Sequence, residues 1–175
     1  MIEAVSPTSE GLEPLLALNN AHAADLSWLT LDEFRQLIAT GFRVTRLNQA
    51  DALMIALDQT ADYTSPNFHW FRERYPRFVY VDRVVVAETA RGQGAGRALY
   101  EDLFDAARKA SHTVVTCEVN LDPPNLASDA FHARMGFARV GEAAIHGGKK
   151  RVSYYARELE ARSQGASSGA PLSVG

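Results

Sequence analysis

Val84-Val85-Val86, followed closely by Arg91-Gly92-Gln93-Gly94-Ala95-Gly96-Arg97, is a β-branched run that meets a glycine-rich turn. An amphipathic segment over 98–110 comes next, so the order predicts a strand, a turn and a helix. Glycines let the backbone approach an anion closely, and the first free N–H groups of a helix point at that anion. The positive end of the helix dipole adds to the attraction. The segment therefore predicts a site for a phosphate-bearing ligand.

The spacing of these glycines decides between kinds of phosphate site. A Walker loop requires Gly-Lys followed by Ser or Thr, but Gly96 is followed by Arg97 and Ala98. A dinucleotide fingerprint requires G-x-G-x-x-G, whereas Gly92, Gly94 and Gly96 are spaced G-x-G-x-G. The pattern Arg91-x-x-Gly94-x-Gly96 resembles the acyl-CoA pyrophosphate loop of the GNAT superfamily of N-acetyltransferases. Taken alone, it is also compatible with an ordinary flexible turn between a strand and a helix.

A second stretch, Asn125 to Phe137, resembles the other GNAT signature, in which an Asn opens a helix and Gly-Phe closes it. Gly136 stands where a helix C-terminal glycine belongs. The two signatures occur in the family's order, with a predicted strand over 113–119 between them, and the resemblance extends from about 42 to 158. It implies an α/β (α+β) fold with a mixed, mostly antiparallel central sheet and helices on both faces. In that fold the fourth and fifth strands splay apart, and the pantetheine arm of acetyl-CoA lies in the gap.

Composition places the chain among ordinary globular proteins. It has 175 residues, of which 46% are hydrophobic and 22% are charged, and its net charge is −3. This charge argues against nucleic-acid binding, and no apolar run is long enough to span a membrane. Residues 1–4 lack the features of a signal peptide, and the single cysteine, Cys117, excludes an internal disulfide. We therefore expect a cytoplasmic protein with one domain over 1–161 and a disordered tail over 162–175, and the resemblance suggests a homodimer.

Local patterns predict the remaining elements. Thr30 and Glu33 form a capping box for a helix that ends before Gly41, while Ser9 is placed to cap a helix over 10–20. Segments 42–47 and 53–57 read as a hairpin, and 78–86 as a central strand. Segment 58–77 is rich in aromatic residues and prolines, which predicts an irregular connection. Cys117 shares a strand face with Val115 and Val119, and this predicts a buried structural thiol.

The resemblance implies acetyl-CoA as the co-substrate and no metal. It assigns the binding of acetyl-CoA to the end of the strand, the glycine loop and the start of the second signature: Val84, Val85, Val86, Arg91, Gly92, Gln93, Gly94, Ala95, Gly96, Arg97 and Asn125. A backbone N–H near the end of this strand is expected to stabilise the oxyanion of the reacting thioester. The five histidines are scattered without the spacing of metal ligands.

Three side chains are candidates for proton transfer. His132 stands four residues before Gly136, where family members often carry a Tyr that protonates the departing CoA thiolate, and a histidine is suited to that role. The alternative is that His132 only packs or caps its helix. Tyr80 and Asp82 share a strand face, and Asp82 is the first candidate for the base that accepts the amine proton. It could instead pair with a buried cation. Glu118 is a second candidate, and water chains replace a dedicated base in some family members.

The acceptor pocket is predicted from the aromatic segment 63–75, together with Asn19, Asn20 and the helix that starts at Leu31. Tyr63 and Trp70, together with Tyr80, could enclose an alkyl or cationic amine, and Glu118 is expected beside it. The alternative is that these aromatics only pack under their loop. The leading function is transfer of an acetyl group to the primary amine of a small molecule by direct attack in a ternary complex. The alternatives are a protein N-acetyltransferase, an acyl-CoA sensor without transferase activity, and a nucleotide-binding module.

Overall fold

A computed structural model describes residues 1–23 and 26–160, so the predicted tail lies outside the described residues. The described part forms one seven-stranded sheet with the strand order β1-β2-β3-β4-β5-β7-β6. The elements in chain order are β1 (Ile2–Ala4), α1 (Leu12–Ala21), α2 (Leu31–Thr40), β2 (Arg43–Leu47), β3 (Ala52–Asp58), α3 (Pro66–Arg72), β4 (Val79–Val86), the short 3₁₀-helix η1 (Glu88–Ala90), α4 (Ala95–Lys109), β5 (Val114–Asp122), α5 (Leu126–Arg134), β6 (Ala138–Ile145) and β7 (Lys150–Glu158).

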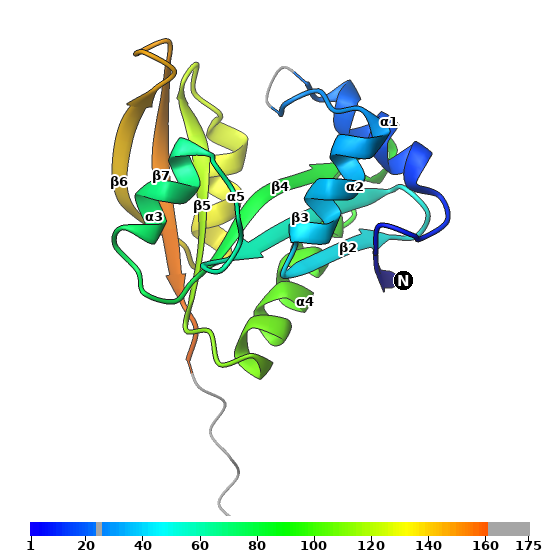
Figure 1. The fold of residues 1–175 in the computed structure, drawn as a ribbon. Helices are drawn as coiled ribbons and strands as arrows, with labels where there is room; N and C mark the ends of the chain where they lie inside the picture. The colour runs from blue at the N-terminus through cyan, green and yellow to red at the C-terminus, as the bar shows by residue number, and fades with distance from the viewer. Residues whose placement is uncertain (24–25, 161–175) are drawn as a thin grey trace, which may run out of the picture.

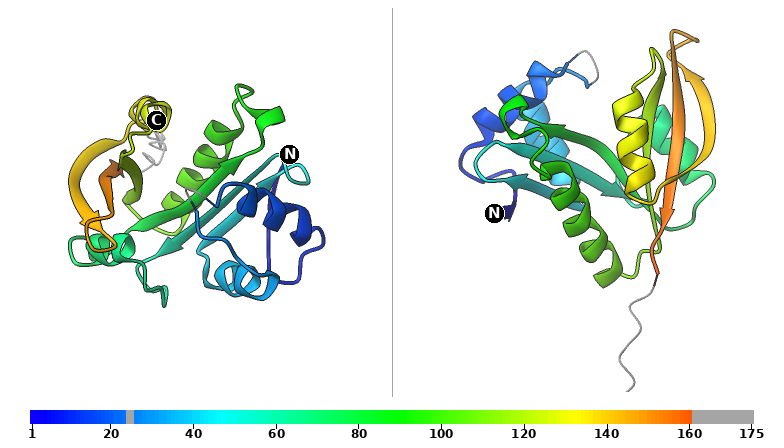
Figure 2. Two further views of the ribbon diagram at one scale, coloured as in Figure 1. Left: turned by 90° about the horizontal axis from the view of Figure 1, so that it is seen from above. Right: turned by 180° about the vertical axis from the view of Figure 1, so that it is seen from behind.

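The sheet is mixed and mostly antiparallel, as the resemblance implied, because β4 and β5 form its parallel pair. Helices α1, α2 and α3 cover one face, and α4 and α5 cover the other (Figure 1; Figure 2, left). Each face has its own hydrophobic core. Strand β3 lies between them, and its residues 52–57 are buried without interruption because both of its faces are covered.

Strands β4 and β5 pair over a short distance only. Val79 pairs with Val115 and Tyr80 with Thr116, and in the described part of the chain no further pairs join these two strands. Beyond them the strands diverge, with β4 turning towards β3 and β5 towards β7 (Figure 1). The β5-facing backbone edge of β4 after Tyr80 therefore has no strand partner. This is the splayed arrangement that the resemblance predicted.

Local predictions for the first two helices had different outcomes. The capping box is confirmed: the Thr30 hydroxyl accepts a hydrogen bond from the Glu33 N–H, and the Glu33 carboxylate accepts one from the Thr30 N–H. The prediction that Ser9 caps α1 was wrong. The N-cap is Gly11, in the left-handed conformation with φ 73°, and Ser9 instead accepts a hydrogen bond from the Ser6 N–H.

The prediction that 58–77 is irregular was wrong in its middle, where α3 spans Pro66–Arg72. Pro66 reads as a break in the sequence, but it occupies the first helical turn, where proline is tolerated because the N–H it lacks would be unpaired. The helix buries Phe68 and Phe71 against the sheet. Helix α4 also begins earlier than predicted, at Ala95, so that the end of the glycine loop forms its first turn.

Candidate functional site

Three glycines shape the loop between η1 and α4 for different reasons. Gly92 and Gly94 have φ values of 74° and 81°, a region that other residues rarely adopt, yet a Cβ on either would meet nothing within 4 Å. Gly96 lies in the helix, and a Cβ there would stand 3.4 Å from the ring of Phe131. Gly92 and Gly94 are therefore needed for backbone conformation, whereas a Cβ at Gly96 would make ordinary van der Waals contact with α5.

Gly94 is the N-cap of α4, and the first hydrogen bond of the helix runs from the Ala98 N–H to the Gly94 carbonyl, at 3.0 Å. The N–H groups of Ala95, Gly96 and Arg97 are thus the free donors of the first turn. They lie at the positive end of a helix of 15 residues. The local structure is suited to a phosphate group.

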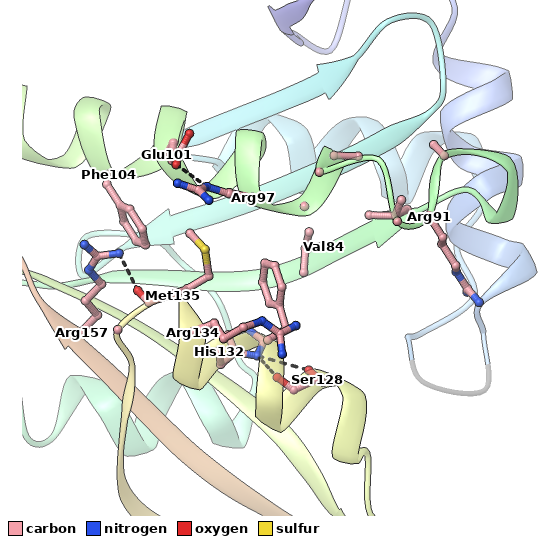
Figure 3. Close-up of a pocket in the computed structure, with 18 of the residues that line it drawn as sticks. Val84, Arg91, Arg97, Glu101, Phe104, Ser128, His132, Arg134, Met135 and Arg157 are labelled. Carbon is pink, nitrogen blue, oxygen red and sulfur yellow. Dashed lines mark hydrogen bonds and ion pairs between the residues drawn. The ribbon is translucent and has the colours of Figure 1, made fainter.

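A cavity of about 1020 Å³ extends from this loop between α4 and α5 (Figure 3). Its charged lining consists of five arginines and two acids: Arg91, Arg97, Arg108, Arg134, Arg157, Glu101 and Asp105. The excess of positive charge favours an anionic ligand larger than a single phosphate. Phe104 and Phe131 supply aromatic wall, and the guanidinium of Arg157 lies over the Phe104 ring at 4.1 Å from its centroid.

The two arginines that the sequence singled out both line this cavity, but each has a protein partner. Arg97 forms an exposed ion pair with Glu101 at 2.7 Å (Figure 3). Arg91 donates a hydrogen bond at 3.3 Å to Nε2 of His22, the residue that follows α1. Gln93 does not contribute to the walls, because its side-chain amide donates to the Thr89 carbonyl.

A second cavity, of about 290 Å³, lies in the gap where β4 and β5 diverge. It shares Val84, Val86, Arg91, Ser128 and His132 with the larger one, so the two adjoin. The remaining predicted residues that line it are Val85, Asp82, Glu118 and Asn125. The glycine loop and the candidate proton-transfer groups are therefore connected through the gap.

A β-bulge in β4 places two oppositely charged residues side by side. Ile55 of β3 pairs with Arg83 and Ala56 pairs with Val81, which leaves Asp82 as the extra residue. Asp82 accepts a hydrogen bond from the Tyr63 hydroxyl at 2.6 Å, and Arg83 donates to Asn19 of α1 at 2.8 Å. Asp82 and Arg83 thus both reach the face covered by α1 and α3, where Tyr80 also packs.

Asp82 is paired with a buried cation, the alternative that the sequence left open. Nε of Arg83 lies 2.7 Å from the Asp82 carboxylate, and the two side chains are 4% and 6% exposed. Each oxygen of Asp82 already accepts one hydrogen bond. Removing either partner of this buried pair would leave an uncompensated charge.

Glu118 of β5 differs from Asp82 in that its carboxyl group accepts a hydrogen bond from a neutral hydroxyl and has no ion-pair partner among the described residues. The Tyr80 hydroxyl donates to Oε1 at 3.0 Å, while Oε2 is buried and has no hydrogen-bond partner among the described residues. Burial raises the pKa of Glu118 to about 8, with a further contribution from the negative charge of Asp82. A carboxyl group with this pKa can exchange a proton near neutral pH.

His132 lies on α5 and is 4% exposed. Its Nδ1 is 2.8 Å from the Ser128 carbonyl and 3.2 Å from the Ser128 hydroxyl, and its Nε2 is 2.8 Å from the Tyr100 hydroxyl. Burial lowers the pKa of His132, so the ring is neutral at neutral pH. The sequence did not single out Tyr100, which lies in the apolar stripe of α4 and also lines the smaller cavity. Its one distinguishing signal is a hydroxyl group on an otherwise apolar helix face.

Three further predicted residues have mainly structural contacts. Trp70 stacks on Tyr154 at 4.2 Å between ring centroids, carries the Arg74 guanidinium on its ring at 3.8 Å, and lines neither cavity. Tyr63 also lies outside both cavities, and burial raises its pKa. Asn125 caps α5 by accepting a hydrogen bond from the Ser128 N–H at 3.1 Å. For Trp70 and Tyr63, packing is the role that the geometry supports.

Within residues 1–23 and 26–160, no group of three or more His, Cys, Asp or Glu side chains is arranged to hold a metal ion. No helix in the same ranges combines the length and the apolar character needed to cross a membrane. Cys117 is buried, as predicted, and burial raises the pKa of its thiol.

A family model for the acetyltransferase (GNAT) family matches residues 54–137, a range that contains β4, the glycine loop, the gap and α5. This matched range belongs to the GNAT acetyltransferase family. It contains both signatures on which the resemblance rested.

The individual relatives match this chain either over a short segment or at low sequence identity. An L-2,4-diaminobutyric acid acetyltransferase of Nocardia farcinica is 39% identical over 70 residues, which cover 40% of this chain and only 35% of the relative. The crystal structure of Ard1 from Thermoplasma volcanium has a TM-score of 0.69 at 16% identity, covering 91% of this chain and 97% of that one. The NatC complex bound to Gag peptide and CoA gives 0.66 at 15% identity, with coverages of 91% and 98%. At these identities the structural likeness shows the fold.

Proposed function

We propose that this GNAT acetyltransferase transfers an acetyl group from acetyl-CoA to the primary amine of a small molecule by direct attack in a ternary complex. One observation carries the proposal: the cavity at the glycine loop adjoins a second cavity in the β4–β5 gap, and that second cavity contains Glu118. An anion-binding end and a proton-accepting end are thus joined by an opening through the sheet. An extended, phosphate-bearing acyl donor fits this arrangement.

The donor is expected to use mainly backbone groups. Its pyrophosphate would accept hydrogen bonds from the free N–H groups at the start of α4, within the positively charged lining of the larger cavity. The amide groups of its pantetheine arm would pair with the edge of Val84–Val86 that faces β5 and has no strand partner there. An N–H of the same edge would then stabilise the oxyanion that forms at the thioester carbonyl.

Glu118 is the base that the geometry favours, because Asp82 is occupied by Arg83 and Tyr63. In its ionised form, Glu118 would remove a proton from the ammonium group of the acceptor. The free amine then attacks the thioester carbon and a C–N bond forms. As the C–S bond breaks to release CoA, the nitrogen loses its second proton, so that an amide forms, one proton goes to the departing sulfur and one goes to solvent. The Asp82–Arg83 pair would serve as a wall of the acceptor end rather than as the base.

The small-molecule acceptor is supported by the segment shared with a protein named as an acetyltransferase of diaminobutyric acid. That relative acts on an amino acid with a second amine, and this chain covers about a third of it, so the acceptor class is part of the proposal. Diamino acids are the first acceptors to test.

The test is release of free CoA from acetyl-CoA with a panel of diamino acids, simple amines and peptides with free N-termini. We expect turnover with at least one small amine and loss of that turnover in Glu118→Gln. Turnover with peptides alone would replace the small-molecule acceptor by a protein N-terminus. Tight binding of acetyl-CoA without turnover on any amine would favour a sensor, and competition by ATP or NAD would favour a nucleotide-binding module.

A further inference from the structure

His132 has no N–H available to a leaving group in the arrangement described. The Ser128 carbonyl can only accept, so Nδ1 carries the proton of the neutral ring and donates it to that carbonyl at 2.8 Å. Nε2 then accepts a hydrogen bond from the Tyr100 hydroxyl at 2.8 Å. Both nitrogens are thereby used. The expectation that His132 itself protonates the CoA thiolate does not follow from this geometry.

Ser128 offers a second arrangement of the same three residues. Its hydroxyl lies 3.2 Å from Nδ1 and can donate to it, in contrast to its carbonyl, which only accepts. The neutral ring can therefore also carry its proton on Nε2, in an arrangement where the ring tilts from the Ser128 carbonyl, 2.8 Å from Nδ1, towards the Ser128 hydroxyl. In that tautomer the ring donates to the Tyr100 oxygen, and the phenolic hydrogen is released from the ring and free to turn towards the smaller cavity.

We propose that Tyr100 is the group that protonates the departing CoA thiolate, and that Ser128 and His132 hold it in the donating arrangement. This inference rests on the proposed transferase function. The proton balance is as follows: the C–S bond breaks, the sulfur takes the phenolic proton, and the phenolate that remains accepts a hydrogen bond from the Nε2–H of neutral His132. The acceptor nitrogen loses two protons in all, one to Glu118 before the attack and one as the amide forms. One of them restores the phenol after CoA departs, and the other is released to solvent.

The location of Tyr100 is appropriate for this role. Its side chain is fully buried, lines the smaller cavity, and lies next to the Cys117 thiol on β5 and within the electrostatic influence of Glu118. The gap where the acyl thioester is proposed to lie is thus bordered by Glu118 and Tyr100, from β5 and α4. The phenol comes from α4, whereas family members often use a Tyr at the His132 position on α5.

A purely structural role would make the same hydrogen bonds, so the test must separate the two. Tyr100→Phe removes only the hydroxyl from a buried ring. Tyr155→Phe is the matched control: Tyr155 also donates its hydroxyl to α5, to Asp129 at 3.0 Å, but it lines neither cavity. Both variants are measured for thermal unfolding, acetyl-CoA affinity, and single-turnover acetyl transfer in H₂O and D₂O.

For Tyr100→Phe we expect a loss of about a hundredfold in the transfer rate, with acetyl-CoA affinity changed by less than about threefold. Its solvent deuterium isotope effect should fall towards unity, because the thiolate then leaves without a proton in transit. Tyr155→Phe should keep both the rate and the isotope effect. Equal rates for the two variants, or an unchanged isotope effect in Tyr100→Phe, would overturn the assignment.

Ser128→Ala gives a second test if Tyr100→Phe fails to fold. It removes the donor to Nδ1 and keeps the carbonyl, so we expect a loss of about tenfold, and no further loss when it is added to a folded Tyr100→Phe variant. An unaffected rate in Ser128→Ala would contradict the proposed chain. A wild-type protein that transfers no acetyl group would instead refute the proposed function.

Discussion

The glycine loop and the β4–β5 gap form the two ends of the proposed site, and the chain builds them by different means. The loop end relies on backbone: two left-handed glycines and the free N–H groups of α4. The gap relies on side chains from separate strands and helices, with Tyr80 holding Glu118 and Tyr100 holding His132. A backbone site is encoded locally in consecutive residues. A site made of side chains exists only after the sheet has formed, so the two ends should respond differently to substitution.

The largest expected effect is at the gap. Glu118→Gln removes the proposed base while keeping the shape of the side chain, so we expect kcat/KM to fall by about a hundredfold or more, with unchanged acetyl-CoA affinity. Glu13→Gln, on the exposed face of α1, is the control and should retain full activity. Steady-state kinetics with a fixed amine measures the effect. A Glu118→Gln protein as active as the control would remove Glu118 from the mechanism.

The pH dependence should identify the same group. Burial raises the pKa of Glu118 to about 8, so the carboxylate that acts as base is the minor form at neutral pH and becomes the major form above pH 8. The ratio of kcat/KM for wild type to that for Glu118→Gln should therefore rise about tenfold per pH unit below this pKa and level off above it. The ratio cancels the titration of the amine itself. A ratio that is flat between pH 6 and 9, about the range needed to bracket this pKa, would contradict the role of Glu118.

At the loop end, Gly94→Ala should weaken donor binding and leave the chemical step intact. Alanine at φ 81° is strained by about 1–2 kcal/mol although the space is open, so the loop is expected to shift, and the KM for acetyl-CoA to rise about tenfold. Gly148→Ala in the β6–β7 hairpin has a similar φ of 84°, also with open space. It should lose similar stability without losing acetyl-CoA affinity. Equal losses of affinity in both variants would show a general effect of instability.

The smallest expected effect concerns stability and uses a histidine outside the site. His112 is buried, its Nδ1 has no hydrogen-bond partner among the described residues, and burial lowers its pKa below 6.5. The unfolded chain therefore binds more protons than the native one in this range, and the free energy of unfolding should fall as the pH drops below 6.5. His112→Phe should lose less stability between neutral pH and pH 5 in urea titrations, a window set about the ordinary histidine pKa. A loss equal to that of wild type would assign the effect to other groups, such as His132.

The contrast between the two ends also explains what the sequence could predict. The glycine spacing, the second signature and the capping box are short-range patterns. The capping box located the start of α2, and the resemblance carried by the two signatures led to the family and the splayed gap. Helix α3 was missed because Pro66 reads as a break although it suits the first turn. The bulge at Asp82 could not be predicted from the sequence, because it arises from the register in which β3 pairs with β4.

The same limit applies to the side chains in the gap. The sequence named Asp82, Glu118 and His132, but it could not show that Arg83 turns back onto Asp82 or that both nitrogens of His132 are occupied. The sequence predicts Tyr100 as a core aromatic residue of α4. Its neighbours in the sequence do not show whether its hydroxyl contacts α5 or solvent. Such contacts join residues 32 positions apart and depend on how α4 and α5 pack.

A crystal structure of the protein with bound CoA tests the central claim most directly. We predict that the pyrophosphate accepts hydrogen bonds from the N–H groups of residues 95–97 and that the pantetheine arm lies along Val84–Val86. The sulfur should then stand in the β4–β5 gap between Tyr100 and Glu118. A CoA molecule whose pantetheine arm bypasses the gap, or whose sulfur lies away from both side chains, would contradict the account.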